Sequence, residues 1–227
     1  MRGGEAALTL RTLPLFKGLP DRQMKLLEQS AVIRTYAPGE MILDERKEAG
    51  GMYVLLAGRA KLFKLSPDGR EQTLYFFGPG EPFCLCSMFD RRRSPANASA
   101  VETCRVLVLS GKIFDEMAQR EPRILFNVLL VVSRRLKEAM ELIESLSFRE
   151  IPGRVAMYLT HTERGGPGVD KVRLPLTHRE LAKVVGATPE ALSRAFRRMA
   201  EDGLVEVKGR EVRILDRERL EGMAAGE

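Results

Sequence analysis

The chain has 227 residues, of which 44% are hydrophobic, and a formal net charge of +6, which predicts a packed protein of one large or two modest domains with a polyanionic partner. No apolar run reaches the ~20 residues of a membrane-spanning helix, so we expect no membrane contact. Three cysteines without a secretory leader favour a reducing cytoplasm over a disulfide framework, so we predict a cytoplasmic location.

The stretch LPLFKGLPDRQMKLLEQSA predicts a short helix-turn-helix leader. From about Val32 to Leu109 the chain contains short strand-like runs. Glycine-containing breaks at Gly58, residues 67–69 and residues 78–80 separate these runs. Such closely spaced strands predict an antiparallel β-sandwich or jelly roll.

A long helix is predicted from about Pro122 to Ser147. Its apolar residues step alternately by four and three positions, which is the spacing of a coiled-coil seam. A seam sustained over three heptads favours pairing with a second copy, so we expect a homodimer; the alternative is a helix packed on its own domain. The predicted dimer interface comprises Leu125, Leu129, Val132, Leu136, Ala139, Ile143 and Leu146.

The C-terminal segment begins near Arg149 with the predicted helix IPGRVAMYLTHTER. THRELAKVVGA follows with Thr177 as its N-cap, and Gly186 ends this second helix. Thr188 then caps the helix TPEALSRAFRRMAEDG, whose first position is Pro189. LVEVKGREVRIL predicts two short strands around a turn, a wing. This order predicts a winged helix-turn-helix, whose second helix enters the major groove of double-stranded DNA.

A polar row on the helix over residues 188–203 carries the functional prediction. Glu190, Ser193 and Arg194 are expected to project outward near the helix N-terminus. Arginine can donate two hydrogen bonds to guanine, glutamate can accept one from cytosine, and serine can do either. We therefore predict that these three residues contact base edges. The apolar stripe that anchors them comprises Leu192, Ala195, Phe196 and Met199.

Other polar residues suit the phosphate backbone, which sets affinity and register. Because a dimer presents two reading helices, the operator should be an inverted repeat with half-sites about one helical turn apart. The alternative for the polar row is an ordinary solvated helix face. The predicted backbone contacts are Thr177, Thr188, Arg197, Arg198, Lys208 and Arg210.

The predicted order of elements, with PGE, GRAKLF and GPGEPF in the sandwich, resembles the CRP/FNR family of bacterial transcription regulators from about Leu13 to Leu215. The resemblance implies an α+β fold with a cyclic-nucleotide-binding-like sensor domain (residues 1–121), a dimerisation helix (residues 122–148) and a winged helix-turn-helix domain (residues 149–227). It also implies RNA polymerase as a partner. Residues 190–194 match the E-x-x-S-R motif of the FNR and DNR/HcpR branches, which implies a TTGA-like half-site.

The resemblance leaves several effectors open. In the cyclic-AMP branch a Gly-Glu pair binds the ribose and an Arg-Ser pair binds the phosphate; Gly80 and Glu81 match the first pair. Ungapped alignment places Ser94 and Pro95 at the second pair. This disfavours a cyclic nucleotide, because proline has no N–H and serine has no charge. A one-residue slip restores Arg93 and Ser94 to that place.

The stretch FCLCSMF resembles the haem-binding stretch of the CooA branch, with Cys84 at the ligating cysteine and Cys86 at the histidine. GEPF, MF and PA elements also resemble the DNR/HcpR branch of haem-linked nitric-oxide sensors. Haem is therefore favoured over thiol redox or metal chemistry at these two cysteines, and three cysteines exclude a four-thiolate iron–sulfur cluster. Alternatively, both cysteines are buried small hydrophobes. The candidate effector pocket comprises Gly80, Glu81, Phe83, Cys84, Cys86, Met88, Arg93 and Ser94.

An enzyme is the competing class, because jelly rolls also form metalloenzymes with histidine ligands on the barrel. Both histidines, His161 and His178, lie in the C-terminal segment, and no phosphate-binding loop or nucleophile motif is present. We therefore predict that the protein is not an enzyme. A dimeric effector-binding adaptor without DNA function is the third class, and the polar row disfavours it.

Overall fold

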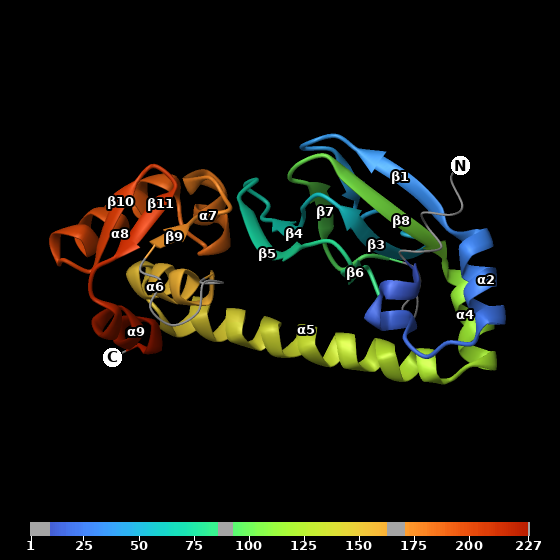
Figure 1. Ribbon diagram of the computed structural model, residues 1–227. Helices are drawn as coiled ribbons and strands as arrows, with labels where there is room; N and C mark the ends of the chain where they lie inside the picture. Colours follow the sequence, from blue (N-terminus) through green and yellow to red (C-terminus); the bar gives the residue numbers. More distant parts are fainter. Residues whose placement is uncertain (1–9, 86–92, 163–170, 227) are drawn as a thin grey trace. The chain divides into compact units, whose positions relative to one another are not determined.

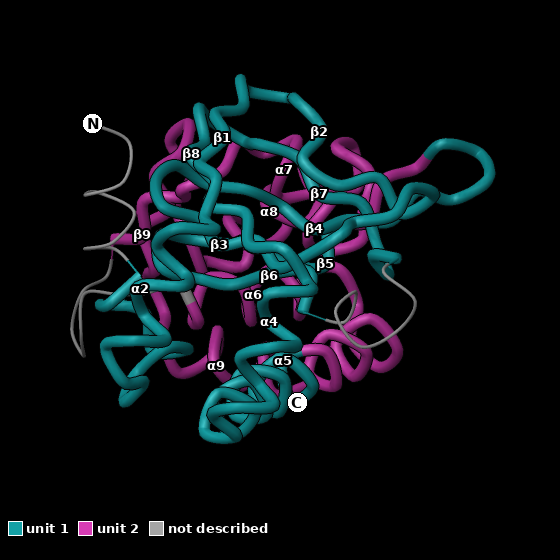
Figure 2. The backbone as a smooth tube through the Cα atoms, turned by 90° about the vertical axis from the view of Figure 1, so that its right-hand side faces the viewer, with its two compact units in different colours: residues 1–69, 73–138 teal, residues 70–72, 139–227 magenta. Residues whose placement is uncertain are grey.

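The computed structural model describes residues 10–85, 93–162 and 171–226 (Figure 1). The chain divides into two compact units, residues 1–69 with 73–138 and residues 70–72 with 139–227, which Figure 2 colours separately. The predicted combination of an antiparallel β-sandwich, a long helix and a helix-turn-helix is confirmed. No helix in the described ranges is long and apolar enough to cross a membrane.

Two four-stranded sheets form the sandwich of the first unit. Antiparallel pairing sets Val32 opposite Val108 and Tyr36 opposite Cys104. One sheet has the order β1 (Val32–Tyr36), β8 (Cys104–Ser110), β3 (Gly51–Ala57) and β6 (Pro82–Phe83). The other has the order β2 (Met41–Leu43), β7 (Asn97–Ala100), β4 (Ala60–Leu65) and β5 (Glu71–Phe77).

Strand β3 shows why this sequence forms a sandwich with helices on one side. Its sequence GMYVLLA contains no charged residue, and alternate residues of a strand face opposite sides of its sheet. Met52 and Val54 accordingly join a core cluster shared with the helices, whereas Tyr53 and Leu55 join a cluster shared with the second sheet. The continuous apolar run is therefore needed because both faces of β3 are covered.

Short helices cover the face of the β1-β8-β3-β6 sheet that carries Met52 and Val54. The predicted leader forms a 3-10 turn, η1 (Pro14–Phe16), and the helix α2 (Asp21–Ser30). A further helix, α4 (Gly111–Arg120), lies beside α2 and packs on β3 and β8 (Figure 1). The sequence patterns did not predict α4, although its Phe114 and Met117 are fully buried.

The long helix α5 (Arg123–Phe148) extends over the predicted range. Ile124, Val128 and Val131 are buried in the helix-side core of the first unit, so part of the helix packs on its own sandwich. A different stripe of the same helix remains exposed. This stripe includes Leu125, Leu129, Val132, Leu136, Met140 and Ile143.

The second unit contains the predicted helix-turn-helix and wing. Its elements are α6 (Ile151–Thr162), β9 (Lys171–Arg173), α7 (His178–Val184), α8 (Pro189–Glu201), β10 (Val205–Lys208), β11 (Glu211–Ile214) and α9 (Arg217–Ala225). The wing is a three-stranded sheet of order β10-β11-β9, rather than the two strands that the sequence predicted. Helix α9 was also not predicted, and it packs on α6.

Candidate nucleic-acid interface

Hydrogen-bonded caps define the two helices of the helix-turn-helix. The hydroxyl of Thr177 accepts the N–H of Glu180 at the start of α7, as expected for the predicted N-cap. The hydroxyl of Thr188 accepts the N–H of Ala191 at the start of α8, and Pro189 occupies the first turn. The predicted boundaries of both helices are therefore set by short-range side-chain chemistry.

The turn between α7 and α8 has little room for a side chain, and a hydrogen bond from α6 fixes its position. Gly186 has φ +63°, which an L side chain rarely adopts, and a Cβ there would lie 2.8 Å from the Leu146 side chain. Arg154 of α6 donates from Nη1 to the carbonyl of Val185 at 2.8 Å and from Nε to the carbonyl of Arg149 at 3.0 Å. This guanidinium joins the start of the DNA-binding domain to the end of α7.

Helix α8 has the two faces that its sequence predicted. Its apolar stripe is buried, with exposures of 1% at Leu192 and 0% at Met199. Phe196 also stacks on His178 of α7, with ring centroids 5.3 Å apart. Glu190, Ser193 and Arg194 are exposed on α8, and so are Arg197 and Arg198. The predicted anchoring stripe is thus confirmed, and the polar row is free to meet a ligand.

The carboxylate of Glu190 is kept in its charged form. Its own backbone N–H, the Thr188 hydroxyl and the nearby Arg194 together lower the pKa of this carboxyl below its ordinary value of 4.5. The backbone contribution arises because the first N–H groups of a helix have no partner within it. Near neutral pH, Glu190 is therefore a hydrogen-bond acceptor only.

The wing places cationic side chains around the turn at Gly209, whose φ is +60°. Lys208 and Arg210 are exposed on either side of it, as predicted. Lys208 pairs with Glu206 at 2.7 Å, and Arg198 of α8 approaches Asp202 at 4.0 Å. These exposed ion pairs are weak, so both cations can exchange to phosphates.

Strand β9 contributes cationic residues that the sequence reasoning missed. Lys171 and Arg173 flank the buried Val172, and the register of β9 with β11 sets Lys171 opposite Arg213. All three cationic side chains are exposed on one face of the wing sheet. The alternating pattern of KVR was a usable signal, but a run of three residues is too short to predict a strand with confidence from its own pattern.

The predicted dimer residues on α5 divide between two environments. Leu129, Leu136 and Ile143 are each about three-fifths exposed, at 59%, 62% and 64%. Leu125, Val132 and Ala139 are exposed as well. Leu146 is half-buried within the second unit, close to Gly186. Six of the seven predicted residues thus form an uncovered apolar stripe in a single chain.

The predicted effector residues do not gather at one place. Phe83 and Cys84 are buried in the cluster between the two sheets, and Ser94 is buried with its hydroxyl donating to the carbonyl of Ala96 at 2.6 Å. Arg93 is exposed and forms a backbone bridge with Glu48. Gly80 and Glu81 line a surface cavity. The remaining two candidates, Cys86 and Met88, lie outside the described residues.

The carboxylate of Glu81 already has partners within its own unit. It accepts the N–H of Gly78 at 2.8 Å and the hydroxyl of Tyr75 at 3.1 Å. The guanidinium of Arg135, from α5, approaches it at 3.3 Å and lies over the Tyr75 ring at 3.6 Å. A ribose hydroxyl would have to compete with these groups for Glu81.

Haem does not fit the described surroundings of Cys84. The thiol is 8% exposed and lies in a packed cluster with Tyr53, Phe77 and Phe83, whose rings contact one another. An iron porphyrin needs an open face beside its ligand. In the described ranges, no group of three or more His, Cys, Asp or Glu side chains is arranged to hold a metal ion.

A winged helix-turn-helix unit in one chain with an antiparallel sandwich defines a DNA-binding transcription regulator. Residues 33–121 match the model of the cyclic nucleotide-binding domain, and residues 153–223 match that of the Crp-like helix-turn-helix domain. The chain belongs to the CRP/FNR family of transcription regulators.

Relatives from several bacteria are similar over most of their length. The chain is 32% identical to the cyclic AMP receptor protein of Thermus thermophilus, over 94% of this chain and 97% of that protein. It is 27% identical to the transcriptional activator protein anr of Pseudomonas aeruginosa, over 86% and 81%. The structure of FixK2 from Bradyrhizobium japonicum has the same fold, with a TM-score of 0.72, 24% identity and coverage of 85% and 96%. The Pseudomonas protein is named as a transcriptional activator, and the family to which this chain belongs consists of regulators rather than enzymes.

Proposed function

We propose that the protein reads DNA sequence with Glu190, Ser193 and Arg194 of α8. The observation that carries this proposal is the division of α8 into a buried stripe and an exposed polar row. Because the stripe fixes the helix rotation, the three side chains are held in one orientation rather than distributed around a mobile helix. Each well-formed bidentate contact to a base discriminates by about 1–3 kcal/mol.

The reading motif supports an operator of the FNR type. Residues 190–194 have the E-x-x-S-R pattern, and a TTGA-like half-site follows from that resemblance. Thr177, Thr188, Arg197, Arg198, Lys208 and Arg210 contact the phosphates in this proposal, joined by Lys171, Arg173 and Arg213 on the wing.

The proposed active form is a homodimer paired through the exposed stripe of α5. CRP/FNR regulators bind DNA as dimers and contact RNA polymerase, and the uncovered leucines of α5 supply the apolar seam that such pairing needs. Two copies of α8 then face an inverted repeat with half-sites about one helical turn apart.

An effector in the sandwich unit controls DNA binding in this proposal. The effector must bind two conformations of the dimer differently, because a ligand shifts an equilibrium only by its differential affinity. Haem is disfavoured as this effector, because Cys84 is buried in a packed cluster with Tyr53, Phe77 and Phe83. A cyclic nucleotide is also disfavoured, since Glu81 is engaged by Tyr75 and Arg135.

Fluorescence anisotropy with a labelled palindromic TTGA duplex tests the reading proposal. Arg194→Ala should weaken binding roughly 10- to 100-fold and reduce discrimination against a duplex with one changed half-site base. Lys25→Ala, which removes an exposed cation on α2 of the other unit, is the matched control and should leave both quantities unchanged. Unchanged affinity in Arg194→Ala would favour an adaptor without DNA function.

A further inference from the structure

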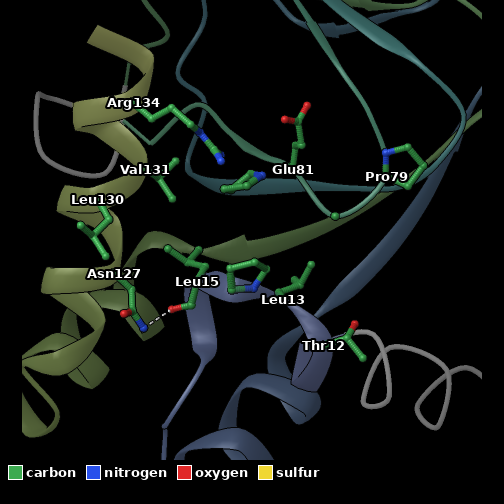
Figure 3. A pocket seen from close by; sticks show the side chains of 12 residues that line it. Thr12, Leu13, Leu15, Pro79, Glu81, Asn127, Leu130, Val131 and Arg134 are labelled. Atoms are coloured by element: carbon green, nitrogen blue, oxygen red, sulfur yellow. Dashed lines mark hydrogen bonds between the residues drawn. The ribbon is translucent and has the colours of Figure 1, made fainter. Parts of the chain in front are cut away.

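A cavity of about 500 Å³ lies in the sandwich unit, apart from the buried Cys84. Three segments distant in sequence form its walls: Thr12–Leu15 of the N-terminal segment, Pro79–Pro82 of the turn between β5 and β6, and one side of α5 (Figure 3). Its volume falls within the range of about 300–1,000 Å³ that small-molecule sites occupy.

Hydrogen bonds from α5 hold the N-terminal wall in place. The side-chain amide of Asn127 donates to the carbonyl of Leu15 at 2.9 Å (Figure 3). It also donates to the carbonyl of Lys17 at 3.2 Å. The N-terminal segment and α5 are therefore tied together at the edge of the hollow. The wall is fixed before any ligand binds, which lowers the entropy cost of binding.

Most of the lining is apolar, and it includes an exposed leucine that lies outside the proposed dimer seam of α5. Leu13, Leu15, Leu130 and Val131 contribute aliphatic surface together with three prolines. Leu130 is 56% exposed, yet it follows the seam residue Leu129 directly and so lies off the seam. Pairing of two α5 helices leaves Leu130 uncovered, whereas a ligand in the cavity would cover it.

One cation, Arg134, faces this surface, which also carries the carboxylate of Glu81. Arg134 is exposed, and its guanidinium points into the hollow (Figure 3). Within the described ranges it has no ion pair, whereas its neighbour Arg135 pairs with Glu81 and Glu138. Arg135 is shared between Glu81 and Glu138, which leaves Arg134 as a cavity-lining cation with no ion pair in the described ranges.

We propose that this cavity binds a small organic acid with one carboxylate and an apolar body. The carboxylate pairs with the guanidinium of Arg134, whose fork of N–H groups matches two carboxylate oxygens. The apolar body lies against Leu13, Leu130 and Val131 and removes their surface from water. This site differs from the base-reading row of α8 in position and in chemistry, so the two proposals stand or fall separately.

A matched pair of probes tests the proposal on the full chain: 2-naphthoate and the uncharged 2-naphthamide, which have the same apolar body. The chain contains no tryptophan, so naphthalene fluorescence anisotropy is measured against a low protein background. The wild type should bind 2-naphthoate about tenfold or more tighter than 2-naphthamide, as a charge-assisted bidentate contact provides.

Arg134→Gln should remove that preference by weakening 2-naphthoate binding about tenfold while leaving 2-naphthamide unchanged. Leu130→Asn should weaken both probes several-fold, because it removes shared apolar contact. Lys137→Gln, an exposed cation on the same helix outside the cavity, should change neither probe. Arg134→Lys keeps the charge and should retain part of the preference, which covers the case of a poorly folded glutamine variant.

The proposal is overturned by equal wild-type affinity for the two probes, by an Arg134→Gln effect no larger than that of Lys137→Gln, or by absence of binding at millimolar probe. Absence of binding would mean that a second copy or another part of the chain covers the cavity. Operator affinity, measured separately with the TTGA duplex, distinguishes failure of this site from failure of the DNA-reading proposal.

Discussion

Helix α8 and the segment around Glu81 both place neighbouring residues in different environments, one buried and the other at the surface. The two regions differ in what determines these environments. On α8 the period of the helix alone separates the buried Leu192 from the exposed Arg194. In the sandwich, Glu81 lines a surface cavity while Phe83, two residues on, lies between the sheets. Local periodicity thus decides which face of α8 is buried, whereas the packing of distant strands decides which residues line the cavity.

The largest expected effect tests whether the exposed stripe of α5 is an interface. Leu136→Asp places a carboxylate in the proposed seam of each protomer, and burying an unpaired carboxylate costs more than the roughly 2–7 kcal/mol of a neutral polar group. Sedimentation should show a dimer weakened by roughly a thousandfold or more. Lys137→Asp is the adjacent control off the seam and should remain dimeric. An unaltered dimer in Leu136→Asp would place the interface elsewhere.

The apolar stripe of α8 should be nearly as sensitive. Phe196 is 5% exposed and stacks on His178, so Phe196→Ala should lower the free energy of unfolding by about 3–5 kcal/mol. Urea denaturation measures this change. The exposed neighbour Arg197 provides the comparison, since Arg197→Ala should change the same quantity by no more than about 0.5 kcal/mol. Equal effects at the two positions would contradict the two-faced helix.

Removing the hydrogen bonds of Arg154, which join α6 to the end of α7, is expected to have an intermediate effect. Arg154→Met retains the aliphatic stem but loses the donors to Val185 and Arg149. Losing these charge-assisted bonds should cost about 1–3 kcal/mol of stability. Operator affinity should also fall, because the end of α7 is released. Arg179→Met on exposed α7 surface is the control, and thermal unfolding with duplex binding measures both quantities.

The N-cap of the reading helix should have a smaller effect. Thr188→Ala removes the acceptor for the N–H of Ala191 and should cost about 1 kcal/mol. Thr188→Ser keeps the hydroxyl and should restore most of the loss, as measured by urea denaturation. Equal losses in both variants would show that the methyl group rather than the hydroxyl matters.

The smallest expected effect concerns pH. The pKa of Glu190 is lowered in the folded chain, chiefly by its own backbone N–H. Its charged form therefore contributes stability that is fully present above pH 4.5 and is lost as the pH falls through the folded value. The stability difference between wild type and Glu190→Gln should be constant from pH 8 to pH 5 and shrink below pH 4.5. A change between pH 6 and pH 7 would point to another group.

The sequence reveals elements whose signals are local and long. The heptad pattern of α5, the caps at Thr177 and Thr188 and the stripe of α8 all act within one helix, and the structure has each of them. Shorter elements escaped prediction. Helix α4 begins with Gly111 without a side-chain cap hydrogen bond, and β9 has only three residues, so neither had a strong start signal.

The positions of the effector candidates, by contrast, could not be predicted from local sequence patterns. Gly80, Glu81 and Cys84 are neighbours in the sequence, yet Cys84 enters the sandwich core, and Glu81 meets Arg135, 54 positions along the chain. Arg134 had no role in the sequence patterns, since nothing nearby in the chain marks it. Leu146 continued the heptad pattern but packs within the second unit, near Gly186.

The sequence by itself determined the class of fold, the two faces of α8 and the apolar seam, because helix and strand periods fix which side chains share a face. Only the tertiary structure decided that Cys84 is buried, that Glu81 pairs with Arg135 and that Arg134 faces a cavity. These outcomes depend on contacts between residues far apart in the chain, and no local period encodes such contacts.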